Sequence, residues 1–193
     1  MNAKPNTIGV YCASSVQIDS VYTVAASRLG KILATEHIAC YNGGGATGLM
    51  GTLTDSMLQC GGSVTGIIPQ FMVDNGWHHP RLSHIEIVGS MHERKARIAG
   101  MSDAVVALPG GIGTLEELLE ILTWKQLGLF AKPIVILNVA NYYAPLLDML
   151  KQAITQHFMR PQHAELWKTV VQPEDVLPAI ASMPLWNKSL SKI

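Results

Sequence analysis

Short apolar runs rich in β-branched residues alternate with longer segments of helical period along this chain of 193 residues. The short runs predict six strands, at residues 7–12, 37–41, 63–68, 84–88, 103–108 and 133–138. The longer segments predict helices, at about residues 21–33, 47–60, 90–101, 116–128, 141–157 and 173–182. Parallel strands need crossover helices, and strands covered on both faces are apolar throughout. The pattern therefore predicts a doubly wound α/β fold, a parallel sheet with helices on both faces, as a single domain of residues 1–193.

The composition excludes several classes of partner and compartment. Hydrophobic residues make up 48% of the chain and the net charge is zero, so neither nucleic acid nor an anionic membrane is expected as a main partner. No apolar stretch approaches the roughly 20 residues of a membrane span, and the N-terminus lacks a signal-peptide pattern. Cys12, Cys40 and Cys60 form no C-x-x-C pair and are expected to be buried reduced thiols. We therefore expect a soluble, cytoplasmic protein.

The turns that follow the predicted strands carry the polar and glycine-rich segments of the chain. In parallel α/β sheets, ligands bind beyond the carboxyl ends of the strands. The turns after the first, second, fourth and fifth strands are therefore expected to converge on one crevice. They bring Ser14-Ser15, Gly43-Gly44-Gly45, the helix with Arg94-Lys95, and the segment 109–117.

The stretch 105-VVALPGGIGTLEELLE-120 joins a predicted strand to a predicted helix through three glycines. It fits neither the dinucleotide fingerprint nor the Walker loop. The physical basis of both motifs nevertheless remains: glycines let the backbone approach a ligand, and the free N–H groups of the following helix attract an anion. A second cluster, 43-GGGATG-48, also joins a strand to a helix. It either contributes to the same phosphate site or is a tight turn that binds nothing.

Glu117 has two interpretations. The spacing of Thr114 and Glu117 matches a T-x-x-E capping box before an apolar run, and spacing alone favours this structural role. Alternatively, a carboxylate beside a glycine loop is well placed to meet a sugar hydroxyl or a water. The apolar stripe of this helix runs through its leucines, so Glu117 is expected to point away from the main core contact.

The helix at 90–101 also has two interpretations. Met91, Arg94, Lys95 and Ile98 lie on one helical face, which would direct two basic side chains into the crevice toward an anionic substrate. The alternative turns Ala96, Ala99 and Gly100 to the core and leaves the basic residues in water.

The segment 69–83 is long enough to suggest a functional lid. Its histidines, His78 and His79, lie near His84, but the spacing matches no zinc motif, so no metal is expected and a mobile pair is the favoured interpretation. Thr123 lies in mid-helix, where a threonine usually bonds back to its own backbone.

Five segments, in order, resemble the LOG (Lonely guy) family, the cytokinin riboside 5′-monophosphate phosphoribohydrolases, which are often labelled lysine decarboxylases. PGGIGTLEE (109–117) matches the family's P-G-G-x-G-T-x-x-E, and MHERK (91–95) matches M-H-x-R-K. The other three are CASS (12–15), GGGATGLMG (43–51) and GIIP (66–69). The similarity runs from about residue 7 to residue 180.

The resemblance implies a Rossmann-like homodimer, without metal or cofactor, that hydrolyses the N-glycosidic bond of a purine nucleoside 5′-monophosphate. Adenine or an N6-modified adenine leaves, and ribose 5-phosphate remains. Arg94 and Glu117 match the pair on which the family's activity depends. Family sites lie near the dimer interface. The substrate-binding positions that the resemblance implies are Ser14, Gly44, Gly45, Lys95, Gly110, Gly111, Ile112, Gly113, Thr114, Glu116 and Thr123.

The implied chemistry suits these residue types. Cleaving a glycosidic bond builds positive charge on the sugar, which a carboxylate such as Glu117 stabilises while it orients a water. Arg94 either holds the phosphate or offsets negative charge on the departing base; because arginine stays charged, it is a poor proton donor.

The chain departs from the family pattern at two positions. Asn42 stands where tyrosine commonly precedes the triple glycine, and Gly76 stands where many members carry a glutamate in the loop after the I-P dipeptide. The loop 70–83, with Trp77, is therefore atypical in the region expected to set base specificity.

Two other functions compete with hydrolysis. The same fold includes molybdenum-cofactor carriers, so a non-catalytic nucleotide or cofactor carrier is the alternative. Lysine decarboxylation would need a lysine set up for pyridoxal chemistry. The sequence shows no such setting: the candidate lysines fall on ordinary helix or loop positions, namely Lys31, Lys125, Lys132 and Lys151.

Overall fold

A seven-stranded sheet forms the centre of the computed structural model, which describes residues 4–186. Every neighbouring pair of strands is parallel, in the order β4-β3-β2-β1-β5-β6-β7. The strands are β1 (Thr7–Tyr11), β2 (Ala39–Asn42), β3 (Val64–Pro69), β4 (His84–Val88), β5 (Ala104–Ala107), β6 (Ile134–Leu137) and β7 (Lys168–Val170). The predicted doubly wound parallel sheet is confirmed.

The direction of strand addition reverses at β1. The chain moves outward from β1 to β4 and then crosses back to place β5 on the other side of β1, where Tyr11 pairs with Ala107. Such a reversal leaves a crevice between the two loops that leave the sheet in opposite directions. The carboxyl ends of β1 and β5 are therefore the expected position of a ligand site.

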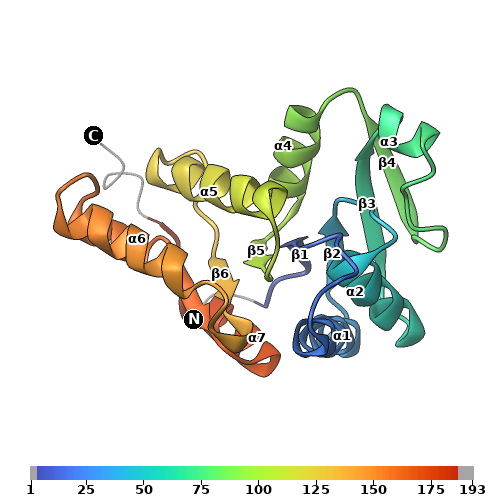
Figure 1. Ribbon diagram of the computed structural model, residues 1–193, viewed down its shortest axis with the longest axis horizontal. Helices are drawn as coiled ribbons and strands as arrows, with labels where there is room; N and C mark the ends of the chain where they lie inside the picture. Colours follow the sequence, from blue (N-terminus) through green and yellow to red (C-terminus); the bar gives the residue numbers. More distant parts are fainter. Residues whose placement is uncertain (1–3, 187–193) are drawn as a thin grey trace.

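Helices cover both faces of the sheet (Figure 1). On one face lie α1 (Ser20–Thr35), α2 (Gly48–Gln59) and α7 (Val176–Ser182). On the other lie α4 (Met91–Met101), α5 (Ile112–Gln126) and α6 (Ala144–Thr155). Successive strand residues alternate between two apolar cores, so Val106 packs under the first group and Val105 under the second. Both strand residues are fully buried, which explains why the central strands read as continuous apolar runs.

Three short elements differ from the sequence-based expectation. The short helix α3 (Gln70–Asp74) interrupts the predicted 69–83 loop, and β7 was not predicted because it has three residues with no apolar run. Strand β4 is an edge strand whose Ile85 and Ile87 are exposed, so full coverage of the sheet was the wrong expectation there. Cys60 is likewise exposed, whereas Cys12 and Cys40 are buried as expected. Within residues 4–186, no helix has both the length and the apolar character needed to cross a membrane.

Near the end of α5, Lys125 is 1% exposed, and its Nζ donates a hydrogen bond to the Lys132 carbonyl at 2.9 Å. Burial lowers the pKa of Lys125 from 10.5 to about 8. Between these values the unfolded chain binds more protons than the folded protein, so this lysine makes the free energy of unfolding rise with pH. The rise is at most about 3 kcal/mol, since one pKa unit corresponds to about 1.4 kcal/mol.

We therefore expect Lys125→Met to be more stable than the parent at pH 7 and to lose the advantage near pH 10. Urea unfolding at both pH values measures the difference, with Lys151→Met, an exposed lysine of α6, as the matched control. An identical pH dependence in Lys125→Met and the parent would contradict the assignment.

Candidate active site

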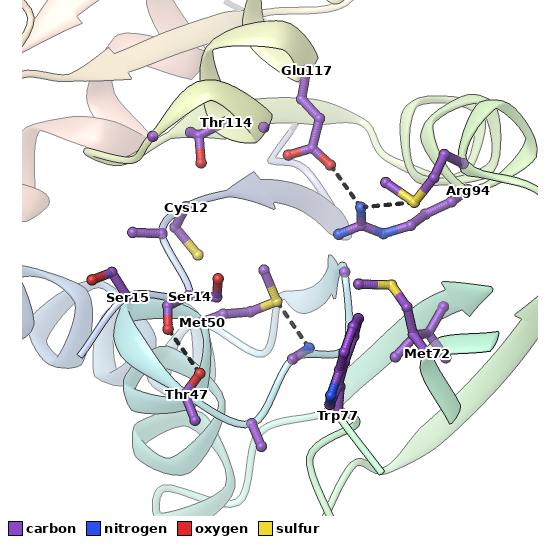
Figure 2. A pocket seen from close by; sticks show the side chains of 18 of the residues that line it. Cys12, Ser14, Ser15, Thr47, Met50, Met72, Trp77, Arg94, Thr114 and Glu117 are labelled. Atoms are coloured by element: carbon purple, nitrogen blue, oxygen red, sulfur yellow. Dashed lines mark hydrogen bonds and ion pairs between the residues drawn. The ribbon is translucent and has the colours of Figure 1, made fainter. Parts of the chain in front are cut away.

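A cavity of about 640 Å³ opens at the carboxyl ends of the strands, beside the β1–β5 reversal (Figure 2). It is lined by residues 12–15, 43, 45–47, 111–114, 116 and 117, and by Met91 and Arg94 from α4. The predicted convergence of four turns on one crevice is confirmed. A fifth segment, after β3, adds Met72, Gly76 and Trp77 to the wall.

The glycine loop leads directly into the amino end of α5. The helix begins at Ile112 with Gly111 as its N-cap, and within the described residues no side chain caps it. At both Gly111 and Gly113, an added Cβ would meet no atom of residues 4–186 within 4 Å, so the space beside this backbone is open. An uncapped helix N-terminus leaves its first N–H groups free to attract an anion.

Tyrosine hydroxyls fix this loop from behind. The Tyr142 hydroxyl donates to the Gly110 carbonyl at 2.7 Å, and the Tyr143 hydroxyl donates to the Leu108 carbonyl at 2.6 Å. From the turn after β1, the Ala13 amide donates to the Pro109 carbonyl at 3.2 Å. The loop carbonyls are thus engaged on the protein side, and the loop is held in place before any ligand arrives.

Glu117 does not form the capping box that its spacing suggested, because α5 begins two residues before Thr114. Instead its side chain is 8% exposed and faces Arg94, with Oε1 3.4 Å from Nη1. Oε1 is buried and has no hydrogen-bond partner among the described residues. Burial raises the pKa of Glu117, and the adjacent Arg94 guanidinium offsets part of that rise. A buried carboxylate with an unused acceptor at a cavity wall is a typical catalytic arrangement.

Arg94 enters the cavity wall from α4, where Ser90 caps the first turn by accepting from the Glu93 amide at 3.1 Å. Its Nε donates to the Ile67 carbonyl at 3.2 Å, and its side chain passes directly over Gly43. A Cβ at Gly43 would lie 1.6 Å from Arg94 Nη2, so the absence of a side chain there makes room for the guanidinium.

Lys95 is buried beside Arg94, so the alternative that left both residues in water is wrong. Lys95 nevertheless does not line the cavity; its Nζ bonds Glu116 and lies 3.1 Å from Glu120. Burial alone would lower the pKa of Lys95, but the hydrogen bonds to Glu116 and Glu120 outweigh it and raise the pKa. The lysine thus ties α4 to α5 and keeps the Arg94 and Glu117 backbones in register.

The second glycine cluster is a turn built around Asn42. This side chain is fully buried: Oδ1 accepts from the Gly44 amide at 2.8 Å, and Nδ2 donates to the Thr54 hydroxyl at 3.2 Å. Gly44 has a φ of +73°, which favours glycine. Asn42, which departs from the family pattern, therefore supports the turn through an amide instead of a tyrosine ring.

Nine of the predicted site residues line the cavity: Ser14, Gly45, Arg94, Gly111, Ile112, Gly113, Thr114, Glu116 and Glu117. Four do not. Gly44 packs behind its turn against Gly66, Gly110 lines a neighbouring cavity of about 110 Å³, and Lys95 binds the two glutamates. Thr123 is exposed, and its hydroxyl donates to the Leu119 carbonyl at 2.8 Å, which is the structural alternative considered for it.

His79 is not part of a mobile pair. It is 4% exposed, and its Nε2 lies 3.0 Å from Asp55 Oδ1 on α2. Among residues 4–186, no group of three histidine, cysteine or acidic side chains is arranged to hold a metal. Sequence reasoning missed Met50 and Met72 as cavity residues, because methionines look like core residues when their partners are unknown, whereas Trp77 lies in the loop that was expected to set base specificity.

The parallel sheet, the cavity at the carboxyl ends of its strands, the uncapped helix N-terminus and the buried Arg94–Glu117 pair define a Rossmann-like α/β protein. A family described as "Possible lysine decarboxylase" matches residues 50–180. "Probable cytokinin riboside 5'-monophosphate phosphoribohydrolase LOGL2" of Oryza sativa subsp. japonica is 38% identical over 95% of this chain and 76% of its own length. "Cytokinin riboside 5'-monophosphate phosphoribohydrolase" of Rhodococcoides fascians is 38% identical over 93% and 89%. The chain belongs to the LOG family.

Solved structures with this fold include two proteins that handle the molybdenum cofactor. The molybdenum cofactor carrier protein of Chlamydomonas reinhardtii has a TM-score of 0.70 at 22% identity, covering 94% of this chain and 98% of its own. The molybdenum cofactor binding protein of Rippkaea orientalis has a TM-score of 0.69 at 22% identity, over 93% and 97%. Identity this low supports the common fold alone.

Among the described residues, no lysine lines the cavity, despite the name of the matching family. Lys125, the lysine with the lowered pKa, is buried at the far end of α5 and bonds the Lys132 carbonyl. A pyridoxal-dependent decarboxylase holds its cofactor through a Schiff base to a lysine of the active site. The cavity does not supply one.

Proposed function

We propose that this protein hydrolyses the N-glycosidic bond of a purine nucleoside 5′-monophosphate, releasing adenine or an N6-modified adenine and ribose 5-phosphate. The observation that carries the proposal is the buried Arg94–Glu117 pair, which lies one helical turn from an open, uncapped helix N-terminus. The names of the family relatives support the same reaction.

In this proposal the 5′-phosphate binds the N–H groups at the start of α5, with the Thr114 hydroxyl beside it. This anchoring places the sugar along α5 toward Glu117, one turn further on. Glu117 is then close to the anomeric carbon, where positive charge develops as the bond to the base breaks. The Glu117 carboxylate can then accept from a water that enters the cavity with the substrate, while its Oε1 stays buried 3.4 Å from Arg94 Nη1.

The reaction balances with one water. The C1′–N9 bond breaks, and its electron pair leaves with the base. The water oxygen forms the new bond to C1′, one water proton passes to Glu117, and the base nitrogen gains a proton from solvent or from Glu117 in turn. Arg94 stays charged throughout; it orients the carboxylate and offsets negative charge on the departing base. In Figure 2, Arg94 lies on the far side of Glu117 from Thr114, which supports this role over phosphate binding.

The direct test is to incubate the pure protein with AMP and with N6-isopentenyl-AMP and to measure free base and reducing sugar together. Equal amounts of both products support the proposal. The corresponding nucleosides, which lack the phosphate, should be cleaved far more slowly. Absence of base release from every purine monophosphate would refute the function.

We further propose a homodimer with its two sites near the interface, as the family resemblance implies. The support is the exposed apolar surface beside the cavity, where Ile112 is 87% exposed and Met91 38%. A partner that covered these side chains would remove apolar area from water and narrow the cavity mouth. Light scattering should then give about twice the 20.9 kDa of one chain, whereas a monomeric mass at micromolar concentration would contradict it.

A further inference from the structure

The loop after β3 is fixed against the second glycine turn. The Ala46 amide donates to the Trp77 carbonyl at 3.1 Å, and the His79 amide donates to the Gly44 carbonyl at 2.8 Å. Between these bonds, His78 and Gly45 form an antiparallel bridge. The buried His79 side chain adds a contact to Asp55. The two backbone hydrogen bonds of this bridge and the His79 side-chain contact hold the Trp77 backbone in a fixed place relative to the cavity.

The Trp77 side chain is only half buried although it lines the cavity. The residue is 53% exposed, and its ring meets Phe71 edge to face, with ring centroids 6.3 Å apart and planes at 84°. Figure 2 shows the indole across the cavity from Arg94 and Glu117, with the Met72 side chain beside it. A rigidly held indole with a large exposed area gains free energy when a ligand covers it.

The side chains around this indole are apolar, and two of them are flexible, polarizable methionines. Met50, Met72 and Ile68 line the same cavity, and Met50 is held by its Sδ, which accepts from the Gly45 amide at 3.0 Å. Thioethers make favourable contacts with aromatic rings and adapt to their edges. Charged side chains lie on the opposite wall, so the cavity has an ionic side and an aromatic side.

We propose that Trp77 is the stacking platform for the purine base, with Met50 and Met72 packed around the base. The proposal rests on the proposed function, which places the phosphate at α5 and the sugar at Glu117 and so leaves the base for the aromatic side. Stacking uses the flat face of the ring and is indifferent to substituents at its edge. The site therefore takes adenine and N6-substituted adenine nucleotides with similar affinity.

Binding by calorimetry tests this assignment without turnover, in the Glu117→Gln background. Trp77→Ala is expected to weaken AMP binding about 10- to 100-fold, the range found when a base-stacking aromatic is removed. Trp77→Phe, which keeps an aromatic face, should recover most of the loss. Ribose 5-phosphate, which has no base, should bind all three proteins within about twofold. The control is Phe158→Ala, which removes an 85% exposed aromatic that does not line the cavity.

The assignment of Trp77 as the stacking platform would be overturned if AMP binding were unchanged by Trp77→Ala. It would also be overturned if ribose 5-phosphate binding fell as much as AMP binding, because that would indicate a displaced loop. Failure of Glu117→Gln to bind AMP at all would overturn it too. Failure of the proposed function is distinct, because it appears as intact AMP after incubation with the unaltered protein, whatever the binding series shows. N6-isopentenyl-AMP should match AMP within a few-fold across the series, and a strong preference for either would contradict stacking as the basis of recognition.

Discussion

Replacing Glu117 with glutamine is expected to lower base release from AMP by about 10²- to 10⁴-fold, the usual contribution of a positioned acid or base. Glutamine keeps the shape of the side chain but cannot accept the water proton or balance charge on the sugar. Two effects on stability oppose each other: Arg94, whose side chain is 8% exposed, loses its counter-charge, and the cost of burying a carboxylate disappears. Burial raises the pKa of Glu117, which means that the fold pays for keeping this carboxylate ionised at neutral pH. The neutral amide removes that cost.

The raised pKa of Glu117 also predicts how activity and stability change with pH. Catalysis needs the ionised carboxylate, so kcat/KM should fall as the pH drops through the pKa of Glu117, and this acid limb should lie above the ordinary value of 4.5. Because the folded pKa is raised, Glu117 favours folding at pH values below the ordinary value and opposes it above the raised one. Glu117→Gln should remove both the acid limb of activity and this part of the stability profile.

Glu120→Gln is the matched control for that experiment. It removes a carboxylate three residues further along the same helix, at a position that does not line the cavity. The glutamine oxygen can still accept from Lys95, and Glu116 remains as the other partner of that lysine. Its activity and acid limb should resemble those of the parent. Equal losses in Glu117→Gln and Glu120→Gln would show that the charge of α5 matters and that Glu117 has no particular role.

The fold could be predicted from the sequence because the central strands obey simple periodicity. Residues such as Val105 and Val106 are both buried, on opposite faces, so a continuous apolar run is the pattern of a covered parallel strand. The edges of the sheet were predicted less well. β4 was predicted at its observed residues, 84–88, but its Ile85 and Ile87 are exposed instead of buried, and β7 was missed because it is too short to show any period.

The kind of site and its place in the fold could be predicted from the sequence, but the roles of individual residues were predicted less well. Arg94 and Lys95 are adjacent in sequence, and both were expected in the crevice, but the two side chains diverge toward the cavity and toward Glu116. Adjacent residues of a helix point about 100° apart, and the buried face of a helix is about as wide. The helical period therefore places both residues on the buried face and does not show which one reaches the cavity. Glu117 matched a capping box because the spacing of Thr114 and Glu117 is the same whether the helix begins at 114 or at 112.

Gly43→Ala is expected to lower activity about as strongly as loss of Arg94 itself, by about 10²-fold or more. The added Cβ would lie 1.6 Å from Arg94 Nη2, so the guanidinium must leave its place between the Ile67 carbonyl and Glu117. The backbone is not the cause, since Gly43 is not among the residues of positive φ. The steady-state rates of Gly43→Ala, Arg94→Ala and the double variant measure the effect.

If the alanine acts through Arg94, the double variant should be no slower than Arg94→Ala, and the two losses should not add. Additive losses would show that Gly43 serves the substrate directly. Gly113→Ala is the contrasting substitution: its Cβ meets no atom of residues 4–186 within 4 Å, and alanine favours a helix over glycine by up to about 1 kcal/mol. That variant should be at least as stable as the parent yet bind ribose 5-phosphate more weakly, because the open space beside Gly113 is where the phosphate would lie. The two glycines then separate by cause: Gly43 makes room for a side chain of the protein, and Gly113 makes room for the ligand.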